Sequence, residues 1–339
     1  MAKYILPPVL ISKMLRSYQY TEKSYIQYSM QNDLLQKKEL DLVRHFVEKH
    51  HARKALSRDC PVCGCKSQRY FFTKWTVDFL CCRNCGSVFA VCDEETEASY
   101  LEDKDLRLLR LSEEYQNQMT ESRQEVWREF LEWVEVRTFR FLGRNRNLSI
   151  VDVGNRLMGL VKMTKESNIC GRYELRDSIC SAACDKINIG EADVVFYNDV
   201  IKTEFEPRKR LQEIKRCMKD DGLIFVGFRA GSGFDVITLK ERNTRISPYE
   251  HILLPSVQGI TKLLEDCGFD ILEITAPGVM DVKYVLDDFD KLDEDDEFVR
   301  QLLTGHSETT LLEFQRFLQK NCMSSFVRVI ARKQGQAHE

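Results

Sequence analysis

A buried strand that turns directly into a helix constrains the fold of this 339-residue chain more than any other feature. The run LSIVDVGNRLMG occupies residues 148–159, and its apolar part ends just before Gly154. An apolar strand followed by a glycine turn and a helix is typical of the first unit of a nucleotide-binding α/β domain. Glycines in such a turn let backbone N–H groups approach a ligand. We therefore expect Asp152, Gly154, Asn155 and Gly159 to line a cofactor site.

Strands and helices alternate regularly in the C-terminal half of the chain. The periodicity predicts strands at 148–153, 171–176, 192–197, 222–228, 269–275 and 326–332, and helices at about 157–166, 207–219, 255–267 and 308–320. This order predicts an α/β fold with a mainly parallel sheet and helices on both faces. Because ligands bind at the carboxyl ends of strands in such sheets, Asn198 and Asp199 are further site candidates. The segment Lys219-Asp-Asp-Gly222 is expected to be a turn in which Gly222 supplies a positive φ.

Two cysteine pairs form the second strong pattern, Cys60-Pro-Val-Cys63 and Cys82-Arg-Asn-Cys85, and each is followed by a glycine. Two such turns provide the tetrahedral four-sulfur site that Zn²⁺ prefers, and the aromatic segment between them suggests a hairpin. The pattern therefore predicts a zinc ribbon. Four protein ligands leave no open position, so we expect a structural or recognition role. The alternatives are a redox dithiol, an emptied ribbon, or exchange of a ligand with one of the two flanking cysteines.

Composition sets the limits on the whole chain. The 50 basic and 53 acidic residues nearly cancel, so no global field recruits nucleic acid or a membrane. No signal peptide is recognisable, and no apolar run approaches the ~18 residues of a membrane span. Thirteen cysteines in such a chain indicate free thiols and a metal site, and we expect a cytoplasmic protein.

The predicted organisation has five parts. They are a helical segment at 1–58, the zinc ribbon at 59–92, a helical linker at 93–147, the α/β domain at 148–332 and a tail at 333–339. The linker carries an apolar stripe that is expected to pack on the α/β domain.

The residues of the α/β domain resemble a known family. The run ADVVFYNDVIKTEFEPRKRLQEIKRCMKDDGLIFVGF, at 192–228, resembles the segment from the fourth to the fifth strand of class I S-adenosylmethionine-dependent methyltransferases. The stretches 232–235, 247–251, 264–269 and 276–282 are similar to a bacterial subgroup that carries a cysteine-pair zinc module ahead of this domain. The resemblance spans residues 59–332. It implies a Rossmann-like sheet of seven strands whose last strand, 326–331, is antiparallel to the others.

The first-strand loop departs from the family pattern, which reads roughly Asp-Val-Gly-Cys-Gly-Thr-Gly. Arg156 and Met158 stand at glycine positions, where their side chains would crowd the methionine and ribose parts of the cofactor. Gly159 could substitute in part through a one-residue slip. The chain therefore departs from the family at positions that contact the cofactor.

Other departures lie on the adenine side. In the family an acidic residue at the end of the second strand binds the ribose hydroxyls, and Glu174 or Asp177 fills that place here. The segment that follows is shorter than in the family, and within it Asp185 is the candidate for the adenine amine. Lys202 and Thr203 stand where the family commonly has Glu-His.

The resemblance implies methyl transfer, which depends mainly on positioning because the sulfonium already activates the methyl group. A base is needed only for a hydroxyl or an acidic carbon. His251 is the candidate base, and Tyr249 and Glu250 could orient it or the acceptor. The alternative is that His251 is a satisfied polar residue beside the following helix. Asp281 could bind an acceptor hydroxyl or cap local backbone.

The predicted function is S-adenosylmethionine-dependent methylation of a small-molecule or sugar-linked acceptor, which includes acceptors on glycans. The alternative is a catalytically degenerate protein that serves as a binding or scaffold component, with a protein partner on the N-terminal helices. Nucleic-acid binding rests only on a modest basic cluster near the ribbon, at Arg53, Lys54, Arg58, Lys66 and Arg69, and is disfavoured. An electron carrier is disfavoured because no flavin motif accompanies the cysteines.

Overall fold

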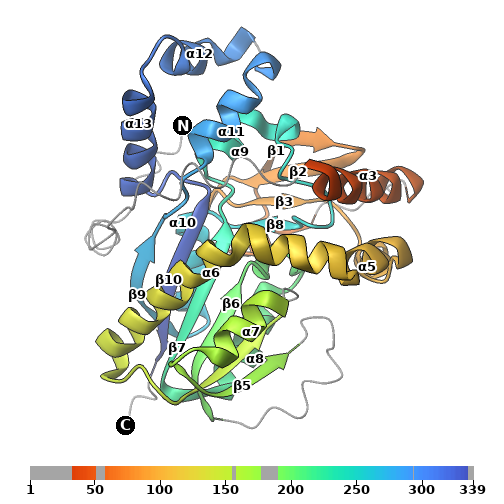
Figure 1. Ribbon diagram of the computed structural model, residues 1–339. Coiled ribbons are helices and arrows are strands. Elements are labelled where there is room, and N and C mark those ends of the chain that lie inside the picture. The colour runs from red at the N-terminus through yellow and green to blue at the C-terminus, as the bar shows by residue number, and fades with distance from the viewer. Residues whose placement is uncertain (1–32, 51–57, 155–157, 177–189, 293, 335–339) are drawn as a thin grey trace.

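The computed structural model describes residues 33–50, 58–154, 158–176, 190–292 and 294–334, which form two sheets flanked by helices (Figure 1). The larger sheet has six strands in the order β5-β4-β6-β7-β10-β9. These strands are β4 (Leu148–Val153), β5 (Cys170–Arg176), β6 (Ala192–Asn198), β7 (Met218–Arg229), β9 (Phe269–Thr275) and β10 (Phe326–Lys333). The first four of them run parallel, whereas β10 is antiparallel to both of its neighbours, β7 and β9.

The strand order reverses at β4, because β5 pairs on one side of it and β6 on the other. Ligands of open α/β sheets bind outside the carboxyl ends of the strands at such a reversal. In Figure 1 the antiparallel β10 runs down toward the C-terminus, so the carboxyl ends of the parallel strands point up, toward the smaller sheet. The candidate site therefore lies between the two sheets.

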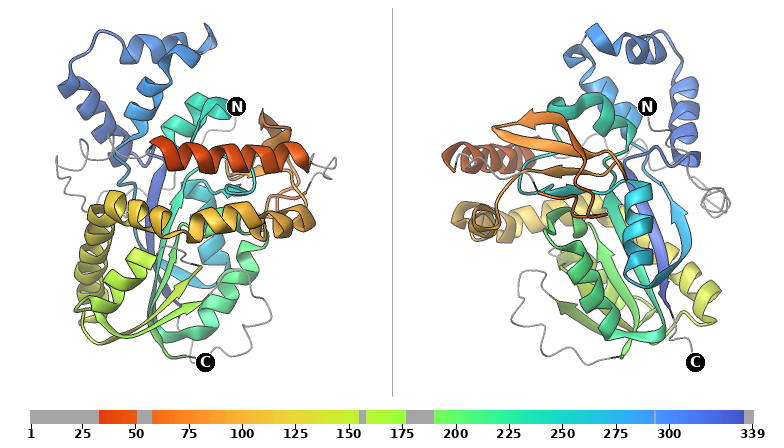
Figure 2. Two further views of the ribbon diagram at one scale, coloured as in Figure 1. Left: turned by 45° about the vertical axis from the view of Figure 1, so that its right-hand side comes forward. Right: turned by 180° about the vertical axis from the view of Figure 1, so that it is seen from behind.

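Helices cover both faces of the larger sheet (Figure 2). They are α6 (Glu113–Leu142) and α7 (Met158–Glu166) on one face, and α8 (Pro207–Cys217) and α10 (Val257–Asp266) on the other. Neighbouring residues of a strand point to opposite faces. Phe196 accordingly packs with Phe130 of α6, and Val195 shares a core with Leu211 of α8. Burial on both faces explains why the central strands read as continuous apolar runs.

The smaller sheet combines the cysteine-rich segment with a distant part of the chain. Its strands are β1 (Gln68–Lys74), β2 (Val77–Cys82), β3 (Val88–Ala90) and β8 (Leu253–Leu254), and all pairings are antiparallel. The β1–β2 hairpin turns at Trp75 and Thr76, whose φ angles are 46° and 76°. A two-residue turn of this kind needs positive φ at both positions, which is strained for Trp and Thr.

The remaining helices lie around these sheets. The helices α3 (Asp33–Lys49), α4 (Glu94–Leu101) and α5 (Lys104–Leu111) precede α6, and α3 and α4 share a core with the smaller sheet. The helices α9 (Phe234–Leu239), α11 (Asp281–Asp287), α12 (Glu297–Leu303) and α13 (Glu308–Lys320) form a separate apolar cluster. Short 3-10 turns are η2 (Ile201–Thr203), η3 (Lys240–Arg242), η4 (Phe289–Lys291) and η5 (Glu294–Asp296).

The predicted fold class is confirmed: the chain has a Rossmann-like α/β sheet, mostly parallel, with an antiparallel last strand. Of the seven strands implied by the resemblance, the described residues form six. One detail is wrong. Residues 219–222 are not a turn but part of β7, which begins at Met218 with a register irregularity, and Gly222 does not have a positive φ. A Cβ there would lie 3.0 Å from the carbonyl oxygen of Ala192, so close strand contact explains this glycine.

Candidate functional site

The carboxyl end of β4 carries two of the predicted cofactor residues. Asp152 is buried, and its Oδ2 accepts a hydrogen bond from the Tyr173 hydroxyl at 2.7 Å. Gly154 has a φ of 72°, a conformation that favours glycine, and its N–H donates to the carbonyl oxygen of Arg176 at 2.6 Å. Gly154 therefore turns the chain out of the strand. Asn155 and Arg156 lie outside the described residues.

Gly159 lies in the first turn of α7, against α6. A Cβ at this position would come within 2.4 Å of Trp127 Cζ3 and 2.5 Å of Thr120 Oγ1. The N–H of Met158 faces the Gln116 Oε1 of α6 at 3.4 Å, and the Met158 side chain is exposed. Close packing of two helices is thus a sufficient reason for the glycine, without a ligand.

The ribose candidate Glu174 lies on β5, two residues before the strand ends. Its carboxylate pairs with Arg176 at 2.9 Å and lies 3.9 Å from Arg172. Glu174 is partly exposed, so its carboxylate is accessible to a ligand. The alternative, Asp177, lies outside the described residues, as does Asp185.

Asn198 and Asp199 lie where β6 ends, beside β7. The Asn198 Oδ1 is buried and has no hydrogen-bond partner, and a Cβ on Gly227 would overlap it at 1.9 Å. Asp199 has a φ of 60°, its N–H donates to the Gly227 carbonyl oxygen at 2.7 Å, and its carboxylate pairs with Lys202 at 2.6 Å. Burial acts to raise the pKa of Asp199, but the charge and hydrogen bond of Lys202 outweigh it and hold the pKa below its ordinary value.

The second group of candidates lies on the loop before β8. His251 is buried, its N–H donates to the Ser247 carbonyl oxygen at 3.0 Å, and its Nδ1 lies 3.3 Å from the Ser247 N–H. Burial, aided by the positive charges of Lys202 and Arg229, lowers the pKa of His251 to about 3. The imidazole is therefore neutral at pH 7, and its contacts with Ser247 are those of a satisfied polar residue.

Tyr249 and Glu250 face the N-terminal helices. The Tyr249 ring packs against Tyr100 and Phe46, each with a centroid distance of 5.7 Å. Glu250 accepts hydrogen bonds from the Tyr100 hydroxyl and from Arg110. Burial acts to raise the pKa of Glu250, but Arg110 and the other positive charges lower it to about 2. These contacts fix the loop in place and do not orient His251 directly.

The two groups of candidates meet in space. The turn η2, which follows β6 and contains Lys202, packs against β8, which begins two residues after His251. The charges of Asp199, Lys202 and Arg229 also shift the pKa of His251. Arg229 is not among the residues predicted from the sequence, although a charged residue at the end of a buried apolar strand can indicate a site. Arg110 comes from a helix far away in the sequence, and no local pattern indicated its role.

Of the two roles expected for Asp281, binding an acceptor hydroxyl or bonding to nearby protein groups, its contacts agree with the second. It is buried, and its carboxylate accepts hydrogen bonds from the side chains of Gln315 and Ser324 at 2.8 and 2.6 Å and from the Ser325 N–H. These bonds join α11 to α13 and to the start of β10.

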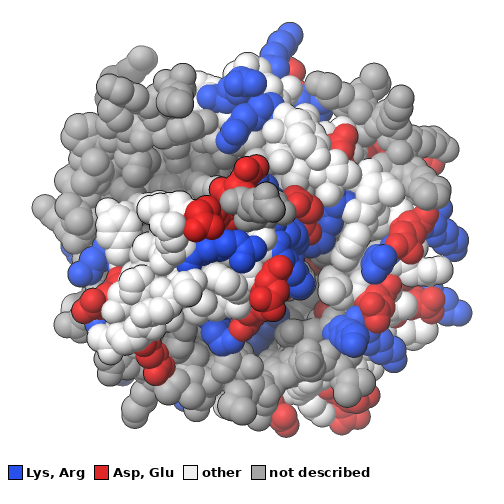
Figure 3. Space-filling view, turned by 90° about the horizontal axis from the view of Figure 1, so that it is seen from above, with Lys and Arg blue, Asp and Glu red and all other residues white. Residues whose placement is uncertain are grey.

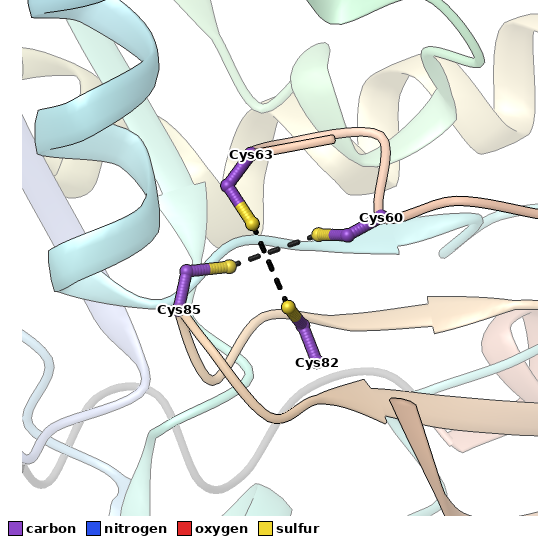
Figure 4. Close-up of side chains that lie close together, drawn as sticks. All are labelled: Cys60, Cys63, Cys82 and Cys85. Carbon is purple, nitrogen blue, oxygen red and sulfur yellow. Dashed lines mark hydrogen bonds between the residues drawn. The ribbon is translucent and has the colours of Figure 1, made fainter. Parts of the chain in front are cut away.

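The four predicted metal ligands converge on one point (Figure 4). The sulfur atoms of Cys60, Cys63, Cys82 and Cys85 all lie within 4.8 Å of one another. The Sγ–Sγ distance is 3.7 Å between Cys60 and Cys85 and 3.6 Å between Cys63 and Cys82. A tetrahedron with zinc–sulfur bonds of ~2.3 Å has edges of about 3.8 Å. The arrangement therefore fits a tetrahedral metal ion.

Two glycine turns hold these sulfurs. Gly64 and Gly86 have φ angles of 70° and 73°, and their N–H groups donate to the carbonyl oxygens of Cys60 and Cys82 at 2.8 and 3.0 Å. The flanking thiols bond elsewhere: the Cys65 thiol contacts the Ser67 carbonyl oxygen, and the Cys81 thiol contacts that of Gly86. Neither belongs to the four-cysteine group.

Two properties of the described residues concern the charge of the surface and the hydropathy of the helices. On the face shown in Figure 3, basic and acidic side chains are interspersed rather than separated. Among the described helices, none combines the length and the apolar character required to cross a membrane.

No protein-family model and no curated protein matches the chain. One similar solved structure is phosphoethanolamine N-methyltransferase 2 of Haemonchus contortus with S-adenosylhomocysteine, at 17% identity and a TM-score of 0.36, covering 61% of this chain and 53% of that one. Another is the geranyl diphosphate C-methyltransferase of Streptomyces coelicolor A3(2), at 13% identity and a TM-score of 0.37, covering 66% and 85%. The chain thus spans about half the length of the Haemonchus protein. The fold assignment rests on the strand order and not on these matches.

Proposed function

We propose that this protein is an S-adenosylmethionine-dependent methyltransferase that acts on a small-molecule or sugar-linked acceptor. The observation that carries the proposal is the contact of η2, which follows β6, with β8, which follows the 247–251 loop, beside the reversal of strand order. Residues assigned to the cofactor and residues assigned to the acceptor come from segments about fifty positions apart. A site at which two substrates react needs such a juxtaposition.

The chain's own residues fit the cofactor in part. Asn198 has a buried oxygen without a hydrogen-bond partner. Asp152 lies on the neighbouring strand β4, Gly154 directly follows that strand, and Glu174 lies on β5, the next strand. When bound, S-adenosylmethionine supplies an already activated methyl group. These residues would hold it. Because the Nδ1 of the neutral His251 accepts the Ser247 N–H, its Nε2 carries the proton and would donate a hydrogen bond to the acceptor rather than take a proton from it.

One observation favours the degenerate alternative. Helix α6 packs so closely on the start of α7 that Gly159 is needed for that contact, and Gln116 faces the first N–H of α7. N–H groups at the start of this helix bind the ligand in dinucleotide-binding folds. A protein that kept the fold but lost the cofactor would show this contact.

Calorimetric titration of the full chain with S-adenosylmethionine and S-adenosylhomocysteine distinguishes the two. We expect micromolar binding that is lost in Gly154→Arg. Gly143→Arg is the matched control, because Gly143 also has a positive φ, of 71°, with open space around it at the end of α6. No heat and no thermal shift at millimolar ligand would reject the methyltransferase and leave the degenerate protein.

We further propose that Cys60, Cys63, Cys82 and Cys85 bind one Zn²⁺ in a structural site. Support comes from the tetrahedral spacing of the four sulfurs and from the burial of Cys60, Cys82 and Cys85. Zinc supplies no chemistry to the acceptor here, because all four coordination positions are taken. A thiolate site also agrees with the reducing, cytoplasmic compartment predicted from the cysteine content.

A further inference from the structure

We propose that the zinc ribbon positions the His251 loop, through a hydrogen-bonded link formed by Ser87 and Ser256. This inference concerns the residues around the proposed metal and does not require methyl transfer. The metal would touch neither cofactor nor acceptor, yet the geometry of the candidate site would depend on it. Ser87 and Ser256 are then positioning residues.

The link begins at a proposed metal ligand. The thiol of Cys85 lies 3.3 Å from the Ser87 hydroxyl, and that hydroxyl accepts a hydrogen bond from the Ser256 N–H at 3.0 Å. The Ser256 hydroxyl in turn donates to the carbonyl oxygen of Cys85. Both serines are buried, so these bonds have no competition from water. Loss of either hydroxyl leaves a buried backbone group unsatisfied.

The link continues along the backbone to the loop. Strand β3, which follows Ser87, pairs with β8 at Val88↔Leu254 and Phe89↔Leu253. The Ala90 N–H then donates to the carbonyl oxygen of Ile252, the residue directly after His251, at 2.8 Å. The ribbon thus holds every residue from 252 to 256 except Pro255, whose carbonyl oxygen bonds to the Gly231 N–H at 3.0 Å.

The ribbon packs closely against the start of helix α10. A Cβ on Gly259 in the first turn of α10 would lie 2.3 Å from the Ser87 hydroxyl and 3.0 Å from Val62, which lies between two of the cysteines. The part of the ribbon that contains Val62 and Ser87 therefore packs directly against the start of α10. There the Ser256 hydroxyl accepts a hydrogen bond from the Gly259 N–H at 2.8 Å. A change at the metal is transmitted to this helix start and to the loop before it.

The end of the ribbon at the β1–β2 turn is linked by hydrogen bonds to Arg229, a second part of the candidate site. Lys74, at the end of β1, is buried and donates to the backbone carbonyl oxygen of Asn243. The Asn243 side chain donates to Asp235 at 3.0 Å, and Asp235 pairs with Arg229 at 2.9 Å. Arg229 is one of the charges that lower the pKa of His251. The strained turn at Trp75 and Thr76 is the kind of conformation that persists only when surrounding contacts hold it.

The test measures the environment of His251 directly. The chain has only six histidines, so labelled imidazoles give a simple NMR spectrum in which His251→Gln identifies its resonance. With the zinc-loaded full chain, we expect Ser87→Ala to retain one zinc per chain and to shift or broaden the His251 resonance by more than its line width. The matched control is Ser307→Ala, which removes the cap of α13 at Thr310 and leaves the site untouched.

Two results would overturn the proposal. One is a wild-type His251 resonance in Ser87→Ala at full zinc occupancy. If Ser87→Ala instead loses zinc, Lys74→Met provides the second measurement, because Lys74 lies at the hairpin end remote from the Gln68↔Cys82 pairing. Zinc-loaded Lys74→Met with an unchanged His251 resonance would then reject a positioning role. Because no activity is measured, failure of the proposed methyltransferase function leaves the result interpretable.

Discussion

At the scale of single residues, the site is defined by charges that burial forces together. Burial and the positive charges of Lys202 and Arg229 lower the pKa of His251, and Asp199 and Glu250 oppose them in part, so the imidazole is neutral at pH 7. Because the Ser247 N–H occupies Nδ1, the neutral imidazole carries its proton on Nε2 and is a hydrogen-bond donor there. Its titration is accordingly the property to measure.

The pH dependence of stability follows from this residue. The folded pKa of His251, about 3, lies below its ordinary value of 6.5, so the unfolded chain binds the proton more tightly. The contribution is fully present above pH 6.5 and is lost as the pH falls toward 3. Between pH 7 and pH 5 the loss is about 2 kcal/mol.

Urea unfolding of the wild type and of His251→Gln at both pH values checks this prediction. The variant should lose less of its free energy of unfolding between pH 7 and pH 5 than the wild type. The exposed His306→Gln is the control. Equal pH dependence in wild type and His251→Gln would show that the folded imidazole titrates normally.

At the scale of elements, α6 is the helix that ties the N-terminal part to the larger sheet. Its apolar residues Trp127, Phe130 and Val134 pack on the sheet, and Arg137 pairs with Glu273 of β9 at 2.8 Å. The Glu273 side chain is only 3% exposed, so neighbouring positive charges and not water must stabilise its negative charge. An ion pair of this kind differs in energy from one on the surface.

Removal of the arginine should therefore be costly. Among the described residues, Arg137→Met leaves the buried Glu273 only Arg140, 4.0 Å away, as a charge partner, and we expect a loss of about 3 kcal/mol in the free energy of unfolding. Arg128→Met breaks the exposed Arg128–Glu125 pair of the same helix and should cost less than about 1 kcal/mol. Similar losses in the two variants, measured by urea unfolding, would contradict the buried-charge argument.

At the scale of the whole molecule, the cysteine module is not separable from the larger sheet. Cys60, Cys82 and Cys85 share one apolar core with Val195 of β6 and Ile260 of α10. Strand β8 completes the smaller sheet from within the C-terminal half. We therefore propose that the predicted ribbon, at 59–92, and the α/β domain, at 148–332, form one cooperative unit.

Metal removal tests this unit. Cys60→Ser or chelation should abolish the one zinc per chain and lower the free energy of unfolding by more than about 3 kcal/mol, with a single transition for all probes. Cys170→Ser, on β5 outside the four-cysteine group, should retain the metal and the stability. A metal-free protein whose larger sheet melts at the wild-type temperature would show that the ribbon folds independently.

Local sequence patterns by themselves determined the elements of this protein. The apolar runs of β4, β6 and β9 and the spacing of the two cysteine pairs depend on neighbours a few residues away, and these predictions agree with the structure to within one or two residues. Only the tertiary structure decided what surrounds each candidate. Packing of Gly159 on Trp127, the bonds of Glu250 to Arg110, and the seating of Ser87 on Ser256 join residues from 32 to 169 positions apart. No periodicity carries such contacts, because they arise from how complete elements pack and not from the order of residues within one of them.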